Sequence, residues 1–478
     1  MKNIDEQAAY IYPSRRDFLK WTVGTSVCLG GLPFLPISSL EAADAANDRP
    51  KNILLVITDQ QHFDTIAAGG CSHLKTPAMD RLYEQGTLFE ASYSTNPVCS
   101  PARSSIFTSR TSSETGVYDN GKSIPSKIPN MGQWFTQHTQ YETVYAGKWH
   151  LPKSYTHSIP GFKVINTGLT GAGYICDLVV SRSCEAYIRN RPTDQSFLMV
   201  ASFMQPHDIC EWLRLYTECP PELRYPELQG QLPPSPKNFD YDKQEPEFVA
   251  KMRLRRDPFV GKSKWDSQQW RYYQWSYYRH IEMVDAEVGR LLEALEQTNR
   301  LQDTLIVFTS DHGEGLGHHQ TVRKNTLYDE SVRVPLIFSW PGHIKKGYTC
   351  PSVPVSGLDI LPTLCDYAGI PVPEKARGLS LKPTLEGEPL EREYVVSEVS
   401  SNAGRMVRTK RYKYIKYIDD PVEQLFDMEK DPDEIKNLAG DSEHAAVVKE
   451  HRRMLATWEN HIEVPADIPH ASQWRNIA

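Results

Sequence analysis

The sequence lacks several features that would place it in large classes of proteins. No apolar stretch reaches the length of a membrane-spanning helix without an interruption by glycine, proline or a polar residue, so a stable membrane span is not expected. Positive charge is not in excess either, because 53 lysines and arginines stand against 60 aspartates and glutamates and give a formal net charge of −7. General electrostatic binding of nucleic acid is therefore not expected. An anionic substrate has to be attracted by a local group of cations.

A disulfide framework is also missing. The chain has nine cysteines, and setting aside Cys28, in the N-terminal segment, and Cys99 leaves seven, an odd number. A chain of 478 residues is long enough to bury a large core without such crosslinks. Cys210 and Cys219 are near enough in sequence to pair after export, but spacing alone does not establish a bond.

Residues 1–45 are typical of an export signal rather than of a folded domain. Arg15 and Arg16 lie in a twin-arginine motif, an apolar run follows over 21–40, and residues 43–45 offer a small-x-small cleavage site. The alternative is a short amphipathic helix on the domain surface. The order of these features favours a twin-arginine signal peptide. It predicts the twin-arginine translocon as a partner and a bacterial periplasmic or extracellular location.

Four apolar, β-branched runs predict buried parallel strands, and each is followed at once by polar residues. The runs and the residues that follow them are 52–58 with Asp59 and Gln60, 140–146 with Lys148 and His150, 196–203 with His207, and 304–309 with Asp311 and His312. Open parallel sheets collect their ligand-binding groups at the carboxyl ends of their strands. We therefore expect these polar side chains at one edge of one sheet.

The remaining chain predicts an α/β fold with a large, mostly parallel central sheet flanked by helices, and a small C-terminal α+β subdomain. Helical spacing is found over 77–86, 268–295, 358–368 and 445–462, and short antiparallel strands are expected at 394–399, 406–409 and 412–418. We assign 50–381 to the catalytic domain and 382–478 to the subdomain. Residues 206–267, rich in proline, arginine and aromatic residues, predict an irregular, substrate-facing insertion.

The segment from Cys99 to Arg103 reads Cys-Ser-Pro-Ala-Arg. A plain cysteine there is either a nucleophile or a small buried hydrophobic residue. The pattern Cys-x-Pro-x-Arg, however, resembles the modification signature of type I sulfatases, which have an alkaline-phosphatase-like fold. The resemblance implies that a formylglycine-generating enzyme oxidises Cys99 to formylglycine, an aldehyde that hydrates. One hydroxyl of the hydrate attacks the substrate sulfur, and the other expels sulfate by collapsing back to the aldehyde.

Two of the strand-end residues, Asp59 and Asp311, carry carboxylates, the ligands that hard divalent cations prefer. His312 is adjacent to the second, and the hydrated residue 99 would supply a further oxygen. On its own, Asp311-His312-Gly313 is an ordinary turn after a strand. Both aspartates at the edge that holds Cys99 predict a metal site, which would polarise a sulfate oxygen.

The resemblance to sulfatases extends along nearly all of the chain after the leader. It includes Gly-Lys-Trp-His at 147–150, Pro-His at 206–207, and Lys324 followed by Tyr-Asp-Glu-Ser at 328–331. It implies that Gln60 occupies a metal-ligand position where many relatives have aspartate. The implied catalytic roles are sulfate binding for Lys148 and Lys324, support of residue 99 for Arg103, proton transfer at the second hydroxyl for His150, and donation to the leaving alcohol or to sulfate for His207.

Substrate contacts are harder to assign. Asn120 is equally compatible with a turn residue and with a contact to the metal ligands or the sulfate. Trp212 and Arg214, with Arg255, Arg256 and Trp265, could stack on sugars and pair with anionic groups, or they could be ordinary packing and surface residues. Export favours a sulfated polysaccharide fragment as the substrate.

The sequence is compatible with more than one metal ion and more than one reaction. Calcium is the first expectation, and manganese or magnesium is compatible with the pair Gln60 and His312. Choline sulfatases and phosphonate monoester hydrolases share this variant, so choline sulfate and phosphonate or phosphodiester substrates are alternatives. Within the sulfatase reaction, sulfamates are an alternative to sulfate esters. Lys148 and His150 favour sulfate over phosphonate. A secreted carbohydrate-binding protein with an inactive site is the alternative outside enzymes.

Overall fold

The computed structural model describes residues 49–477 except 169–171, 217–221, 257–264 and 352. The predicted leader at 1–45 and Cys219 lie outside the described residues, as do the side chains of Arg255 and Arg256. The described residues pack as one compact unit. The domain boundaries at 381 and at the 206–267 insertion stay predictions. Among the described residues no helix is both long and apolar enough to cross a membrane.

A central sheet of eight strands organises this unit. Its order is β5-β4-β6-β1-β7-β8-β2-β9. The strands are β1 Asn52–Asp59, β2 Thr87–Phe89, β4 Glu142–Gly147, β5 Lys163–Asn166, β6 Phe197–Pro206, β7 Thr304–Ser310, β8 Leu336–Ser339 and β9 Tyr348–Cys350. All neighbouring pairs are parallel except that β8 is antiparallel to β7 and β2. The mostly parallel central sheet is confirmed.

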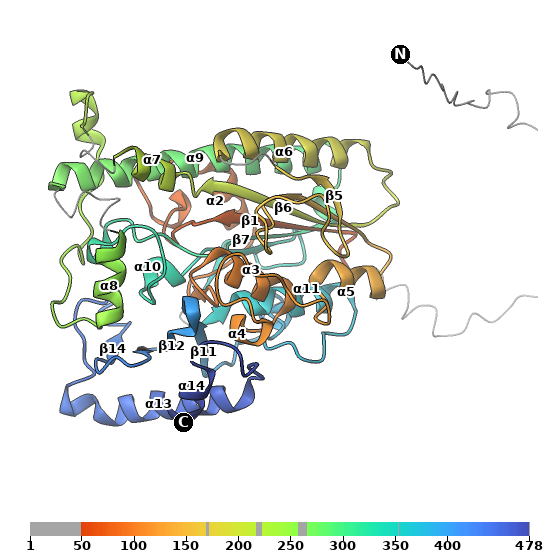
Figure 1. Cartoon of the computed structure of the whole chain (residues 1–478). Helices are drawn as coiled ribbons and strands as arrows, with labels where there is room; N and C mark the ends of the chain where they lie inside the picture. The colour runs from red at the N-terminus through yellow and green to blue at the C-terminus, as the bar shows by residue number, and fades with distance from the viewer. Residues whose placement is uncertain (1–48, 169–171, 217–221, 257–264, 352, 478) are drawn as a thin grey trace, which may run out of the picture. The chain divides into compact units, whose positions relative to one another are not determined.

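Helices cover both faces of this sheet, as Figure 1 shows. The face with α6 and α9 buries apolar side chains of α2, α6 and α9, and the opposite face buries those of α3, α5 and α11. The helices are α2 Pro77–Gln85, α3 Cys99–Thr108, α4 Ser112–Thr115, α5 Met131–His138, α6 Gly173–Asn190, α9 Ser267–Gln297, α10 Asp329–Val332, α11 Ile360–Ala368 and α12 Lys382–Leu385. Every residue of β1 is buried, because alternate side chains enter the two opposite cores.

The described part of the segment 206–267, which was expected to be irregular, contains two α-helices and a short 3-10 helix. The α-helices are α7 Ile209–Leu215 and α8 Glu247–Arg256, and the 3-10 helix is η2 Pro226–Gln231. Trp212 of α7 packs on the aromatic side chains of α9 and on Trp265, so packing stabilises a helix that the proline-rich composition did not suggest. The segment is therefore not irregular throughout, and its role as a substrate-facing insertion stays a prediction.

The C-terminal part forms a second, antiparallel sheet, as expected. Its strands, in spatial order, are β11 Tyr394–Glu398, β12 Gly404–Thr409, β13 Tyr412–Tyr417 and β14 Gln424–Asp427. One face packs on α13 Ala445–His461 and on Trp474 of α14 Ala471–Ile477. The other face packs on Tyr93 of β3 Ser92–Tyr93, which pairs with β10 Val355–Ser356, and on the segment around α10.

A buried ion network joins the second sheet to the body of the molecule. The Lys413 ammonium of β13 lies 2.8 Å from the Asp329 carboxylate of α10 and 2.7 Å from that of Glu434. The Lys413 side chain is fully buried, and the Asp329 backbone N–H donates to Glu434 at 2.6 Å. Buried charges are tolerated only when they are paired in this way.

Candidate active site

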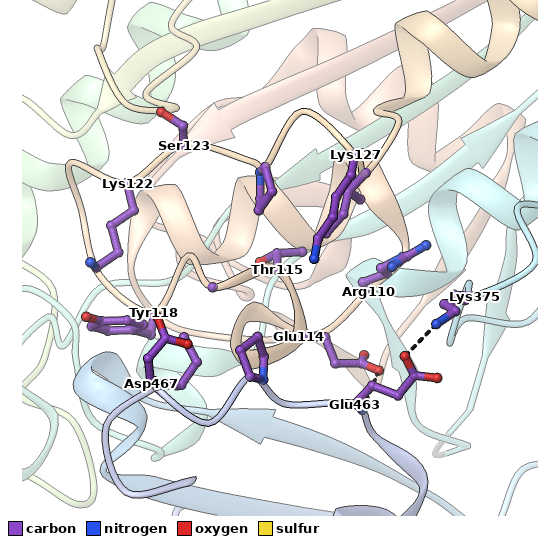
Figure 2. Close-up of a pocket in the computed structure, with 15 residues that line it drawn as sticks. Arg110, Glu114, Thr115, Tyr118, Lys122, Ser123, Lys127, Lys375, Glu463 and Asp467 are labelled. Carbon is purple, nitrogen blue, oxygen red and sulfur yellow. Dashed lines mark hydrogen bonds and ion pairs between the residues drawn. The ribbon is translucent and has the colours of Figure 1, made fainter.

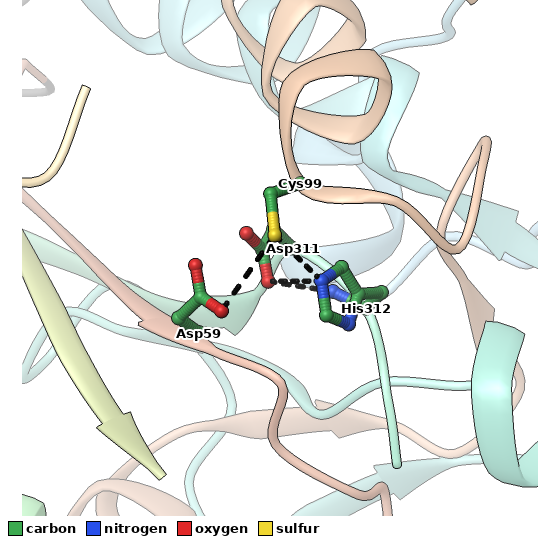
Figure 3. A group of neighbouring side chains, drawn as sticks. All are labelled: Asp59, Cys99, Asp311 and His312. Carbon is green, nitrogen blue, oxygen red and sulfur yellow. Dashed lines mark hydrogen bonds and ion pairs between the residues drawn. The ribbon is translucent and has the colours of Figure 1, made fainter. Parts of the chain in front are cut away.

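Two strand ends and the start of a helix bring four chemically active side chains together (Figure 3). Asp59 ends β1, Asp311 and His312 directly follow β7, and Cys99 begins α3. One ligand atom from each lies within 4.8 Å of the others, and all four residues are buried. The strand-end rule thus places these side chains in one group, which we call the Cys99 cluster.

The Cys99 thiol occupies the centre of this cluster. Its Sγ lies 3.1 Å from His312 Nε2, 3.8 Å from Asp59 Oδ1 and 3.8 Å from Lys148 Nζ. Burial and Asp59 raise the pKa of Cys99. The charges of Lys148, Lys324 and His312 outweigh them and hold this pKa well below its ordinary value. Position 99 therefore suits a polar, electron-rich atom rather than an apolar filler.

Arg103 links the two carboxylates of the cluster from one turn further along α3. Its Nε donates to Asp311 at 2.8 Å, one terminal nitrogen donates to Asp59 at 3.1 Å, and the other donates to Ser202 Oγ and the Lys148 carbonyl, both at 2.8 Å. The guanidinium is fully buried. Every contact is charge-assisted, so Arg103 fixes both carboxylates in place.

A glycine brings Lys148 into the cluster. Gly147, at the end of β4, has φ +98°, and a Cβ there would lie 1.9 Å from the Ser202 carbonyl oxygen. Only glycine permits this approach of β4 to β6. The next residue then places its Nζ 2.5 Å from Asp59 Oδ2. Burial raises the pKa of Asp59, but the charges of Lys148 and other nearby cations outweigh it and hold the pKa well below its ordinary value.

A polar pocket of about 560 Å³ lies next to the cluster. It is lined by Val98, Asp119, Asn120, His207, Cys210, Glu211, Arg214, Met252, Arg323, Lys324, Asn325, Ser400 and Ser401. Val98 precedes Cys99, and His207 Nε2 lies 4.0 Å from Asp59. We call this the active-site pocket, because its floor adjoins the Cys99 cluster.

Gln60 lies between the cluster and the pocket, and both the nitrogen and the oxygen of its side-chain amide make hydrogen bonds. Its backbone N–H donates to Asp311 at 3.1 Å, its side-chain nitrogen donates to Glu314, and its oxygen accepts from Lys324. Glu314 also accepts from the Tyr273 hydroxyl and is fully buried. The sequence prediction missed Glu314. Its only signal was a carboxylate three residues after Asp311, close to a glycine-rich loop.

The other predicted site residues occupy different places. Asn120 lines the pocket and accepts a hydrogen bond from the Ser100 N–H at 3.0 Å. The backbone oxygen of His150 accepts from Ser100 Oγ at 2.5 Å, and its buried Nδ1 has no hydrogen-bond partner in the described part of the chain. Arg214 lines the pocket beside Glu211, at 2.9 Å.

Trp212 and Cys210 lie near the site without belonging to the Cys99 cluster. Trp212 packs on Trp265, Tyr272 and Tyr273 and is not among the residues that line the active-site pocket. Cys210 Sγ accepts from the Gln60 amide at 3.3 Å. Because Cys219 lies outside the described residues, the pairing of these two cysteines is not tested.

The donor set of the Cys99 cluster fits a divalent cation. Asp59 and Asp311 offer carboxylate oxygens, His312 an imidazole nitrogen, and residue 99 a further ligand atom, in a space of the right size. Hard cations prefer such oxygen-rich sets. Gln60 was predicted as an additional ligand; its amide is engaged by Glu314 and Lys324.

Comparison with known proteins agrees with this geometry. Residues 51–370 match the family model "Sulfatase", and 317–461 match the model for the C-terminal part of N-sulphoglucosamine sulphohydrolase. A Δ4,5-hexuronate-2-O-sulfatase of Bacteroides thetaiotaomicron is 32% identical over 446 residues, covering 87% of this chain and 89% of that protein. An N-acetylglucosamine-6-O-sulfatase of the same organism is 28% identical, covering 88% and 89%. The solved structure of a 2-O GAG sulfatase superposes with a TM-score of 0.76 at 29% identity, covering 90% of this chain and 96% of that one.

Proposed function

The chain belongs to the sulfatase family and hydrolyses sulfate esters, and on that premise we propose that its substrate is a sulfated carbohydrate and its nucleophile a formylglycine hydrate at position 99. The observation that carries the proposal is the contact of Cys99 Sγ with His312, Asp59 and Lys148 beneath a polar pocket. In the modified enzyme, the hydrate oxygens of residue 99 would lie where Sγ lies in the unmodified chain.

The residues around position 99 have separate roles in the proposed reaction. Asp59, Asp311, His312 and residue 99 would hold a divalent cation, for which we propose Ca²⁺. Such an ion, when bound, stabilises the ionised hydrate and polarises a sulfate oxygen. Arg103 keeps the two carboxylates oriented toward position 99.

The cations nearer the pocket face the substrate. Lys148, 3.8 Å from Cys99 Sγ, is placed to donate to a sulfate oxygen, and Lys324 borders the pocket itself. His207 lines the pocket beside Asp59 and is the candidate donor of a proton to the leaving sugar oxygen. In the net reaction water is consumed, the bond between sulfur and the sugar oxygen breaks, and the alcohol and inorganic sulfate are released.

The polar character of the active-site pocket supports a carbohydrate substrate. Its lining offers amide and hydroxyl groups, including Asn120, Asn325, Ser400 and Ser401, which exchange hydrogen bonds with sugar hydroxyls. The two relatives named above act on sulfated sugars, one a hexuronate and one an N-acetylglucosamine. The polar lining thus favours a sulfated sugar, and these two relatives agree with it.

The decisive test combines mass and turnover. Protein co-produced with a formylglycine-generating enzyme should show a peptide around residue 99 that is lighter by about 18 Da than the thiol form, the difference between thiol and aldehyde. Cys99→Ala should abolish desulfation of sulfated mono- and disaccharides while the protein stays folded by circular dichroism. Turnover by this variant near the wild-type level would contradict the nucleophile. A strong preference of the wild type for phenyl phosphonate over nitrophenyl sulfate would contradict the substrate class.

A further inference from the structure

A second pocket, of about 610 Å³, is shown in Figure 2. Its lining comes from two parts of the chain that are distant in sequence, residues 110–128 and residues 463–468, together with Lys375. It contains none of the residues of the Cys99 cluster. The reaction proposed above makes no use of it.

The charges in this second pocket are unevenly paired. Two of its carboxylates have partners, since Glu463 lies 2.5 Å from Lys375 and Glu114 bonds to Arg377. The remaining charged groups are Arg110, Lys122 and Lys127 against Asp467. Across the described residues, no ion pair involves any of these four. The pocket therefore presents three cations to one acid, in a protein whose net charge is −7.

The arrangement suits an anionic sugar better than a simple anion. Figure 2 shows Lys122 and Tyr118 at one end, Arg110 at the other, and Lys127 reaching in between them. The Lys122 ammonium sits 4.2 Å from the centroid of the Tyr118 ring, which gives this end an amphipathic surface. Cations bind sulfate or carboxylate groups, and Asp467 accepts hydrogen bonds from hydroxyl groups, which a bare anion lacks.

One turn forms a wall of both pockets. Tyr118 and Lys122 line the second pocket, whereas Asp119 and Asn120 between them line the active-site pocket. The Asn120 side chain accepts from the N–H of Ser100, the residue that follows Cys99. Asp119 and Asn120 span at most about 7 Å even when extended. The wall between the two pockets is therefore no thicker here than this turn.

We propose that the second pocket binds a further anionic sugar residue of the same carbohydrate chain whose sulfate ester lies at residue 99. The proposal rests on the proposed function, because it assumes a sulfated carbohydrate substrate. The affinity of the enzyme would then depend on the length of the carbohydrate chain and on anionic groups outside the reacting sugar. The gain in affinity belongs to oligosaccharides and is absent for a single sulfated sugar or a disaccharide.

Binding can be measured without turnover. The Cys99→Ala protein is titrated calorimetrically with a heparin disaccharide and a heparin octasaccharide. Adding Lys122→Gln and Lys127→Gln should weaken octasaccharide binding about five- to tenfold, as expected for two exposed charge contacts, and leave disaccharide binding unchanged. Lys346→Gln is the matched control, because this exposed lysine lines neither pocket.

The outcomes separate the two proposals. Unchanged octasaccharide binding in the double variant, or an equal loss in the Lys346→Gln control, would overturn the second pocket as a binding site. In the otherwise unaltered enzyme, the same double variant should lower kcat/KM for an octasaccharide but not for a disaccharide that the enzyme desulfates. Absence of desulfation of every sulfated sugar by the wild type would contradict the proposed function and leave the binding result to decide on the pocket.

Discussion

At the scale of single residues, the site depends on groups that touch no substrate. Glu314 is fully buried and accepts hydrogen bonds from Gln60, Tyr273 and the backbone N–H of Arg323. Gln60 in turn contacts Lys324, which borders the active-site pocket. Glu314 thus positions a predicted sulfate-binding lysine through one intermediate side chain.

Replacing Glu314 by glutamine should lower activity without unfolding the protein. The substitution exchanges one acceptor oxygen for an NH₂ donor, which then faces donors already present around it. By analogy with residues that orient catalytic ligands, we expect kcat/KM to fall about 10- to 100-fold, measured with the substrate that the wild type desulfates best. Tyr273→Phe is the control, since it removes only one donor and should cost much less. Wild-type kinetics in Glu314→Gln would show that Glu314 has no positioning role.

Sequence reasoning reached the Cys99 cluster through two signals, the polar residues at strand ends and a motif. Asp59, Asp311 and His312 are found by the strand-end rule, and Cys99 by its motif. Glu314 was missed because its partners, Gln60 and Tyr273, come from distant parts of the chain. Trp212 was left open between a sugar contact and ordinary packing, because a sequence pattern does not distinguish the two for an aromatic residue; in the structure it packs on α9.

At the scale of elements, a buried ion pair ties the loop after β7 to α10. His319 Nδ1 lies 3.0 Å from Glu330 Oε1, and the imidazole stacks on Tyr328. Burial lowers the pKa of His319, but Glu330 outweighs it and raises the pKa above the ordinary value of histidine. A raised pKa in the folded state means that this pair stabilises the fold fully below about pH 6.5 and loses that effect as the pH rises through the folded value.

Replacing His319 by glutamine should therefore cost more stability in acid than in base. At about pH 6 the variant leaves Glu330 buried without its charged partner, and we expect a loss of about 3 kcal/mol in the free energy of unfolding. The difference from the wild type should shrink as the pH rises toward about 9. Urea unfolding of both proteins at the two pH values measures it, and a difference independent of pH would contradict a charged pair.

The four strands that carry the site were predicted with boundaries accurate to within about three residues, because continuous apolar runs of strand length have few other structures open to them. The antiparallel strand β8 and the helices α7 and α8 were not predicted from the sequence. The orientation of β8 depends on connections that leave no periodic signal. Both helices lie in a segment, 206–267, whose nine prolines indicated irregular structure.

At the scale of the whole molecule, we propose that residues 1–45 direct export of the folded protein through the twin-arginine translocon. The proposal rests on Arg15 and Arg16, the apolar run that follows and the small residues at 43–45. Export of folded chains suits an enzyme whose residue 99 is modified before it leaves the cytoplasm. It would place the enzyme where extracellular carbohydrate fragments are found.

Replacing both Arg15 and Arg16 by lysine should retain the protein in the cytoplasm with its leader uncleaved. Cell fractionation followed by intact-mass measurement gives both readouts. A single Lys20→Arg substitution, which keeps the arginine pair, is the control and should leave export unchanged. Efficient export of the double lysine variant would contradict this route.

The network around Lys413 has a consequence for how the chain can be divided. Its ammonium neutralises carboxylates contributed by α10 and by Glu434, and apolar side chains of the C-terminal sheet cover Tyr93 and Tyr328. A fragment ending near residue 381 would remove Lys413, leave Asp329 with only Arg333 at 3.7 Å as a cationic partner, and uncover that apolar face. The tail is thus an integral part of the folding unit, and exchanging it between relatives would succeed only if the lysine and its carboxylates were transferred as a set.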